Sequence, residues 1–247
     1  LAFAVATRGA DHNRGLGESA IGLPQLKEAL GSQEAMDRLL PDLAGDGLTR
    51  ADLVIEAIVE KSEPKQELFR MVEQKVRPQA LLASNTSSIP LEVIGQALKD
   101  PTRLIGLHFF NPVPVMPLIE IVRGLLTSDE TLDAVRALGQ VLDKQLVFAK
   151  DNPGFIVNLL LVPYLFDAIR ALENGVATKE DIDTGIKLGL NHPMGPFTLL
   201  DFVGLDTCLF IGDAMYQEFK DVRYAAPPLL RRMVTAGLLG RKSGRGF

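Results

Sequence analysis

The chain has 247 residues, of which 47% are hydrophobic and 23% charged, a composition typical of globular proteins rather than of disordered ones. Its net charge of −5 argues against nucleic acid or an anionic membrane as the main partner. The single cysteine, Cys208, excludes an intramolecular disulfide, and its apolar neighbours indicate a core residue rather than a nucleophile.

No apolar run reaches the length that a membrane span requires, and no signal-peptide cleavage pattern follows Leu1. The sequence also lacks an initiator methionine. We therefore interpret the chain as a fragment of an intracellular protein, from the bacterial cytoplasm or, in a eukaryote, the mitochondrial matrix.

Residues 1–51 contain one loose match to a glycine-rich dinucleotide-binding loop, Gly15-x-Gly17-x-x-Ala20. A working loop of this kind follows a strand directly and opens a helix. Here the polar stretch RGADHNR separates the match from the nearest apolar run, so we interpret it as a chance match. We expect the first βαβ unit of such a fold to be incomplete or altered in this chain.

Beyond residue 51, short apolar runs alternate with segments of helical periodicity. The pattern predicts strands at 52–60, 80–84, 103–110 and 146–150 and helices at 63–75, 90–98 and 129–142. Alternation of this kind is typical of a doubly wound, largely parallel sheet with helices on both faces. Ligands bind such sheets beyond the carboxyl ends of the strands.

Polar side chains gather at three of these predicted strand ends, namely Glu60, residues 85–88 and residues 108–111. Within the stretch 106–124, His108 and Glu120 each lie in an apolar, strand-like run. A carboxylate beside a histidine fixes its tautomer and supports its role as a base. The alternative is a core histidine satisfied by a carbonyl group, with Glu120 an unrelated surface charge.

After a turn at residues 151–154 the pattern becomes helical to the end of the chain. This change predicts a domain at 1–150 and a helical domain at 151–247. The helices of the second domain are more apolar than a small domain needs, which indicates a homodimer interface.

Several long motifs in one order now identify a resemblance. They are DLVIEAIVE, ASNTSSI, GLHFFNPVPVM, DNPGFIVN, HPMGPF and the terminal GRKSGRGF. Over residues 50–247 the chain resembles the L-3-hydroxyacyl-CoA dehydrogenases, either the stand-alone enzymes or the dehydrogenase part of a fatty-acid β-oxidation multienzyme. The resemblance implies a Rossmann-like NAD-binding domain followed by an all-α dehydrogenase and dimerisation domain. It also implies hydride transfer to NAD from the 3-hydroxyl carbon of an acyl-CoA.

The resemblance further implies roles for individual residues. His108 and Glu120 match the catalytic pair, and Ser87 and Asn158 match residues that contact the substrate. Cofactor contacts are implied for Ala57, Glu60, Lys65, Ser87, Asn111 and Lys242. Leu159 departs from the family, which usually has an arginine there.

Most of these residues have a simpler alternative. Ser87 and Ser88 could cap the helix near Pro90, Lys65 could be a solvated helix charge, and Asn158 could bond within its own domain. We expect His192 in a loop or domain contact. The histidines and the cysteine show no metal-ligand spacing, so we expect no metal.

Three questions stay open at this point. The missing glycine loop also fits a non-catalytic relative, crystallin-like or acyl-CoA-binding, without a working NAD site. The acidic residue that would reject NADP is not recognisable either. The chain could be a separate homodimer or one piece of a multifunctional β-oxidation protein.

Overall fold

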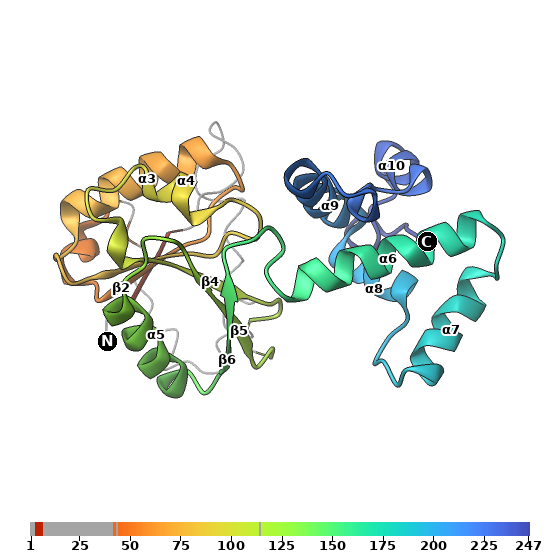
Figure 1. Ribbon diagram of the computed structural model, residues 1–247, viewed down its shortest axis with the longest axis horizontal. Coiled ribbons are helices and arrows are strands. Elements are labelled where there is room, and N and C mark those ends of the chain that lie inside the picture. The colour runs from red at the N-terminus through yellow and green to blue at the C-terminus, as the bar shows by residue number, and fades with distance from the viewer. Residues whose placement is uncertain (1–2, 7–41, 43, 114) are drawn as a thin grey trace. The chain divides into compact units, whose positions relative to one another are not determined.

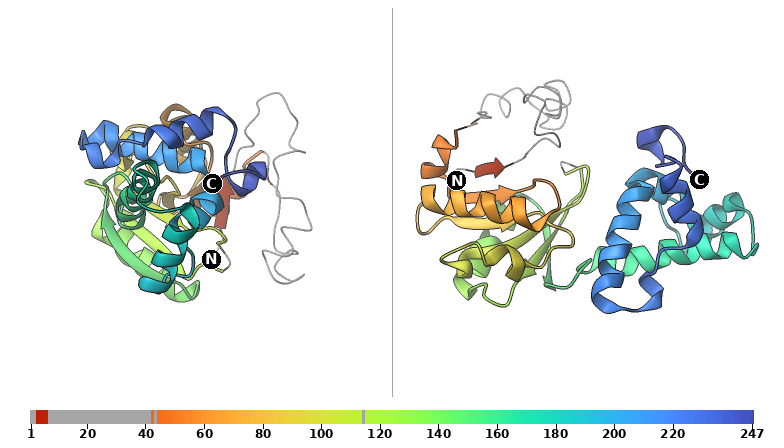
Figure 2. Two further views of the ribbon diagram at one scale, coloured as in Figure 1. Left: turned by 90° about the vertical axis from the view of Figure 1, so that its right-hand side faces the viewer. Right: turned by 90° about the horizontal axis from the view of Figure 1, so that it is seen from above.

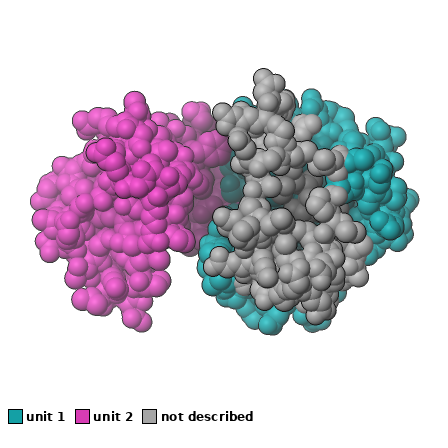
Figure 3. Space-filling model, turned by 180° about the vertical axis from the view of Figure 1, so that it is seen from behind, with its two compact units in different colours: residues 1–152 teal, residues 153–247 magenta. Residues whose placement is uncertain are grey.

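A computed structural model describes residues 3–6, 42, 44–113 and 115–247. Two compact units divide the chain, Leu1–Asn152 and Pro153–Phe247, coloured separately in Figure 3. We call them the sheet unit and the helical unit. The glycine-loop match at residues 15–20 lies outside the described residues.

Within its described residues, the sheet unit has six strands in the order β1-β2-β3-β4-β5-β6 (Figure 1). The strands are β1 (Phe3–Ala6), β2 (Leu53–Glu56), β3 (Leu81–Ser84), β4 (Leu104–Phe109), β5 (Leu118–Arg123) and β6 (Gln145–Lys150). All neighbouring pairs are parallel except β4 and β5. The strand β1 lies beside β2 (Figure 2), although no strand was predicted before residue 52.

Helices cover both faces of this sheet, as predicted. The helices α3 (Ser62–Lys75) and α4 (Leu91–Gly95) lie on one face and α5 (Asp129–Val141) on the other (Figure 1). Apolar residues of β2 to β5, among them Ile105 and Ile119, form a core with Leu132, Val135 and Leu138 of α5. The expectation of a Rossmann-like sheet followed by helices is therefore confirmed.

Strand β2 is shorter than predicted: the predicted strand ran to residue 60, whereas β2 ends at Glu56. The carboxylate of Glu56 accepts the backbone N–H of Ile58, with 2.6 Å between nitrogen and oxygen. That contact turns the chain away from the sheet, so residues 57–60 form a loop above the carboxyl end of β2. The predicted helix at 90–98 is also shorter, ending at Gly95.

The helical unit packs its helices around an apolar core. Its helices are α6 (Val157–Glu173), α7 (Lys179–Gly189), α8 (Pro196–Val203), α9 (Leu205–Phe219) and α10 (Pro228–Thr235). Cys208 is 2% exposed in this core, and burial raises the pKa of its thiol to about 12, so the prediction of an inert core cysteine is confirmed. No helix of the described residues is long and apolar enough to cross a membrane.

Candidate active site

Sheet register brings His108 and Glu120 together. They lie directly opposite each other in the antiparallel pair of β4 and β5. Residues paired in this way point to the same face of a sheet, with their side chains within reach of each other. The distance from His108 Nδ1 to Glu120 Oε2 is 2.7 Å.

Both members of this pair are buried, His108 at 7% exposure and Glu120 at 0%. The alternative of an unrelated surface glutamate is therefore wrong. A carboxylate that accepts the Nδ1 proton leaves Nε2 as the basic nitrogen of the neutral ring. The edge of the Phe110 ring packs against the imidazole, with 4.8 Å between ring centres. These contacts restrict the ring to one orientation.

The loop after β3 is held to the neighbouring strand ends on both sides. On one side, Asn85 Oδ1 accepts the backbone N–H of Phe109 at 2.9 Å. On the other, Glu60 Oε1 accepts the Thr86 hydroxyl and the backbone N–H groups of Ser87 and Ser88, at 2.5, 2.9 and 3.1 Å. The three polar clusters predicted at strand ends thus do meet at the carboxyl edge of the sheet.

Glu60 carries its negative charge in a half-buried position. Burial acts to raise the pKa of Glu60, but the Lys65 ammonium, the Thr86 hydroxyl and the Ser87 N–H outweigh it and hold that pKa below its ordinary value. The hydroxyl of Ser88 also donates to Glu60, at 3.0 Å. The alternative that Ser88 caps α4 is therefore wrong, since Asp151 accepts the first N–H of that helix, from Leu91.

Lys65 is not the solvated helix charge considered as its alternative. It is 1% exposed, on the face of α3 that packs on the sheet. Its ammonium lies 2.7 Å from Glu56 Oε1 and 3.1 Å from Glu60 Oε2. Sequence reasoning had not included Glu56 in the site. The signal was present, since a glutamate inside an apolar strand needs a buried partner.

The remaining predicted residues occupy other positions. Ala57 and Asn111 are exposed, just after β2 and β4 respectively. Asn158 is half-buried in the first turn of α6, and Lys242 forms an ion pair with Asp206 at the start of α9. The exposed ring of His192 lies edge-on to Tyr164, 6.0 Å between centres. Asn158, Lys242 and His192 belong to the helical unit.

A lysine that sequence reasoning missed holds the proline-rich loop after His108. Lys144 Nζ donates to the carbonyl oxygens of Val113 and Met116, at 2.9 and 2.7 Å. Pro112 O accepts the N–H groups of Val115 and Met116, both at 3.0 Å, which closes a turn. No sequence pattern singles out Lys144, because it follows α5 as one polar residue among several.

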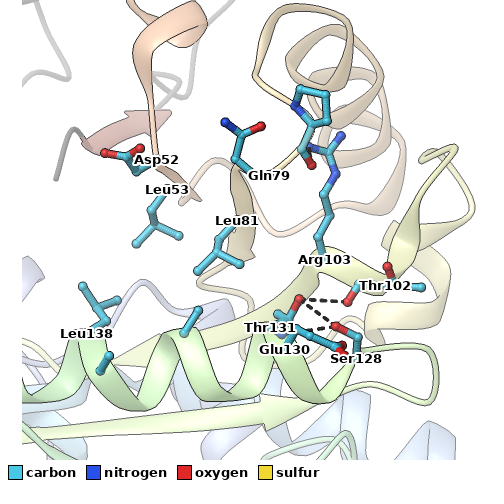
Figure 4. Close-up of a pocket in the computed structure, with 13 residues that line it drawn as sticks. Asp52, Leu53, Gln79, Leu81, Thr102, Arg103, Ser128, Glu130, Thr131 and Leu138 are labelled. Atoms are coloured by element: carbon cyan, nitrogen blue, oxygen red, sulfur yellow. Dashed lines mark hydrogen bonds between the residues drawn. The ribbon is translucent and has the colours of Figure 1, made fainter.

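A cavity of about 570 Å³ lies at the amino ends of β2 and β3, opposite the carboxyl edge that carries the polar clusters (Figure 4). Leu53 and Leu81, the first residues of β2 and β3, line it together with residues of α5. None of the predicted site residues lines this cavity. The candidate active site is therefore indicated by the polar side chains at the carboxyl edge and not by this cavity. Among the described residues, no group of three or more His, Cys, Asp or Glu side chains could hold a metal ion.

Two protein-family models match the chain. One is described as 3-hydroxyacyl-CoA dehydrogenase, NAD binding domain, and matches residues 11–152. The other is described as 3-hydroxyacyl-CoA dehydrogenase, C-terminal domain, and matches residues 154–247. The first match includes the segment Gly15-x-Gly17-x-x-Ala20 that we had interpreted as a chance match.

Individual relatives agree with these models. A 3-hydroxybutyryl-CoA dehydrogenase of Mycobacterium tuberculosis is 54% identical over 202 residues, which are 81% of this chain and 71% of that protein. The crystal structure of M. tuberculosis FadB2 is similar with a TM-score of 0.86 and 48% identity, covering 90% of this chain and 82% of the other. The (S)-3-hydroxybutyryl-CoA dehydrogenase PaaH1 of Ralstonia eutropha follows at 0.84 and 43%, covering 91% and 81%.

Proposed function

Because the chain belongs to the 3-hydroxyacyl-CoA dehydrogenase family, with NAD as its cofactor, we propose that His108 and Glu120 are its catalytic pair. The reaction is the oxidation of an L-3-hydroxyacyl-CoA to the 3-ketoacyl-CoA. The observation that carries the proposal is the 2.7 Å contact between two buried ionisable groups at the carboxyl edge of the sheet.

His108 is the general base in this mechanism. Its Nε2 takes the proton of the substrate's 3-hydroxyl group as C3 becomes a carbonyl carbon. NAD, when bound, would supply the acceptor for the hydride that leaves C3. The imidazolium that results is stabilised by the Glu120 carboxylate at Nδ1. In the reverse direction, His108 returns the proton to the oxygen of the ketone.

The other predicted residues bind and orient. The hydroxyl of Ser87 can donate a hydrogen bond to the reacting oxygen, and the Asn158 amide can polarise the substrate carbonyl. The carboxyl edge of the sheet suits NAD, since Ala57 and Asn111 are both exposed there. The resemblance implies further cofactor contacts for Glu60, Lys65 and Ser87 of the sheet unit and for Lys242 of the helical unit.

We infer a short-chain substrate, because two of the similar proteins above are named 3-hydroxybutyryl-CoA dehydrogenases. A place in fatty-acid β-oxidation is consistent with that substrate. Comparing kcat/KM for acetoacetyl-CoA and 3-ketodecanoyl-CoA tests the inference. A preference for the longer substrate would contradict it.

His108→Gln is the direct test of the catalytic pair. We expect the rate of acetoacetyl-CoA reduction by NADH to fall by about 10²–10⁴-fold, the usual contribution of a general base. Binding of NADH, followed by its fluorescence, should persist because the ring is not proposed to hold the cofactor. Near-normal turnover in this variant would exclude His108 as the base.

The same titration separates the enzyme from a non-catalytic relative. Saturable NADH binding by the unmodified chain is expected for the enzyme. A chain that binds acetoacetyl-CoA but not NADH would instead support an acyl-CoA-binding relative.

We also propose that the helical unit pairs with a second copy of the chain. Large apolar side chains are exposed on it, among them Leu160 at 69% and Leu188 at 74%. Large exposed apolar side chains that gather into a patch are typical of protein interfaces. Sedimentation of the purified chain should give a dimer. A monomer would support the alternative that the chain is one piece of a multifunctional β-oxidation protein. For either form we propose a place in the cytoplasm or the mitochondrial matrix.

A further inference from the structure

A half-buried lysine holds the loop that follows the proposed base. Lys144 lies in the turn between α5 and β6, and its Nζ donates to the carbonyl oxygens of Val113 and Met116, at 2.9 and 2.7 Å. Hydrogen bonds from a charged donor are stronger than those between neutral groups. Among the described residues no carboxylate forms an ion pair with this lysine. The backbone of the loop is therefore the partner that holds its ammonium.

The turn that carries Lys144 is itself tied to the sheet. The N–H of Lys144 donates to Gly139 O at 3.2 Å, and the N–H of Gln145 donates to Pro117 O at 2.7 Å. The second bond lies next to the pair of Leu118 and Gln145 that opens the parallel ladder of β5 and β6. The lysine side chain therefore starts from a fixed position beside the end of the loop.

The two carbonyl groups that Lys144 holds belong to a turn closed on itself. Pro112 O accepts the N–H groups of Val115 and Met116, both at 3.0 Å. We call residues 112, 113, 115 and 116 the Pro112 turn. Because Met116 is bonded through both its N–H and its carbonyl oxygen, a lysine that holds this carbonyl holds the turn as one body.

The Pro112 turn is close to His108 along the chain. Strand β4 ends at Phe109, whose N–H is bonded to Asn85 Oδ1, so the chain is fixed to the sheet up to that residue. Only Phe110 and Asn111 connect Phe109 to the turn. The edge of the Phe110 ring packs against the imidazole, with 4.8 Å between the ring centres and 64° between the ring planes. A shift of the turn would therefore move the ring that borders the imidazole.

We propose that Lys144 is a positioning residue for the proposed base. By holding the Pro112 turn it keeps Phe110 against the His108 imidazole, so that Nε2 keeps the direction that proton transfer needs. The proposal rests on the proposed function in one respect, since His108 is taken to be the base. The hold of the lysine on the turn, and through it on Phe110, does not depend on that assignment.

Lys144→Met removes both hydrogen bonds and keeps an unbranched side chain of similar length. We expect kcat for acetoacetyl-CoA reduction to fall by about 10- to 100-fold, because small displacements of a catalytic group lower the rate steeply. The ratio kcat/KM should fall by the same factor, since the direction of the base matters in the transition state and not in substrate binding.

Two further variants show whether the hydrogen bonds of Lys144 are responsible. Lys144→Arg restores a cation with several N–H donors and should recover most of the lost rate. Lys99→Met removes an exposed lysine from the connection between α4 and β4. It is the matched control and should behave as the wild type.

Two structural measurements on Lys144→Met need no catalysis. Amide hydrogen exchange at Val115 and Met116 should accelerate, because the turn that protects these amides is no longer held. The NMR signals of the His108 ring nitrogens should broaden or double as the imidazole gains a second orientation. These measurements test the role of the lysine even if His108→Gln shows that another residue is the base.

A double-mutant cycle tests whether Lys144 acts through Phe110. Phe110→Leu removes the ring edge from the imidazole and keeps an apolar side chain. If both residues act on the same orientation, Lys144→Met/Phe110→Leu should lose no more rate than the more affected single variant. Losses of kcat that multiply would mean that the lysine acts elsewhere and would overturn the proposal.

Three other results would also overturn the proposal. The first is a folded Lys144→Met variant with unchanged amide exchange and unchanged ring signals, or with wild-type kcat where His108→Gln has lost its activity. The second is a raised KM with unchanged kcat, which is the signature of a direct contact with substrate or cofactor. The third is a Lys144→Met chain that circular dichroism shows to be unfolded, because the lysine would then support the whole sheet unit.

Discussion

The sheet unit and the helical unit bury different kinds of side chain. Buried polar and charged residues, from Glu56 to Thr131, all come from the sheet unit among the described residues. The core of the helical unit consists of aliphatic and aromatic side chains with Cys208 and Met residues. Buried charge is costly and is retained where chemistry or specificity requires it. The difference supports the proposal that the acid–base chemistry belongs to the sheet unit, whereas the buried residues of the helical unit serve packing.

Removing a buried carboxylate from the sheet unit should produce the largest effect on activity. In Glu120→Gln the partner of His108 becomes neutral, and we expect kcat to fall by about 10²-fold or more. Glu173→Gln is the matched change in the helical unit, where Glu173 accepts the backbone N–H of Leu229. Steady-state kinetics should show almost no effect there. Equal losses of kcat in both variants would contradict the difference between the two units.

Removing a core aromatic from the helical unit should affect stability instead. Phe166 is 0% exposed, and its ring fills the space above Gly212. We expect Phe166→Ala to lower the free energy of unfolding of that unit by about 3–5 kcal/mol. The urea midpoint should fall while the Kd for NADH is unchanged, and Glu218→Ala at an exposed position of α9 is the control. Weaker NADH binding in Phe166→Ala would contradict the separation of roles.

The pH dependence of stability should carry a contribution from Asp151, at the end of the sheet unit. Burial and the nearby Glu92 carboxylate raise the pKa of Asp151 to about 7. An unfolded aspartate titrates near pH 4, so at intermediate pH the folded chain binds the extra proton. The stabilisation is complete below that lower value and is lost as the pH rises through about 7.

Asp151→Asn removes this titration and keeps an oxygen for the Leu91 N–H. Between about pH 5 and pH 8, the urea midpoint should fall more steeply for the wild type than for the variant. Parallel curves for the two proteins would show that Asp151 does not hold the proton. A steeper fall in the variant would reverse the sign and assign the proton to another group.

A surface ion pair should give the smallest effect. Asp133 and Arg136 on α5 are 2.6 Å apart, with both side chains more than half exposed. Asp133→Ala should change the free energy of unfolding by less than about 1 kcal/mol, and less still at high salt. A large effect in chemical denaturation would mean that surface charge matters as much as the buried network.

The sequence predicts the sheet well because its signals are local. The strands around His108 and Glu120 show as apolar runs, and the histidine and the glutamate inside these runs identify the pair. The end of β2 escaped prediction, because Glu56 bonds to Ile58 of its own chain and no periodicity reports such a contact. The first strand was missed as well, since residues 3–6 form β1 only by pairing with β2.

The helical spacing of Lys65 indicated a buried position, but the charge of its side chain argued against one. Lys65, Phe69 and Val72 follow the spacing of one helical face, and all three are buried. A lysine on an apolar face is ordinarily expected to extend to solvent. Only the tertiary structure shows that two glutamates, one at the end of β2 and one in the loop after it, form ion pairs with the lysine. Which side chains α3 meets cannot be read from the helix itself.

The antiparallel pairing of β4 and β5 has a consequence for how this enzyme can vary. The spacing of His108 and Glu120 is set by the ladder of backbone hydrogen bonds, and not by the eleven intervening residues. The loop between the strands could therefore lengthen, shorten or change sequence in a relative while the base and its carboxylate stay in register. A slip of one residue between the two strands would instead turn one of the pair to the other face and abolish the contact. Differences in sequence and length can accumulate in that loop, whereas the register of the two strands must stay fixed.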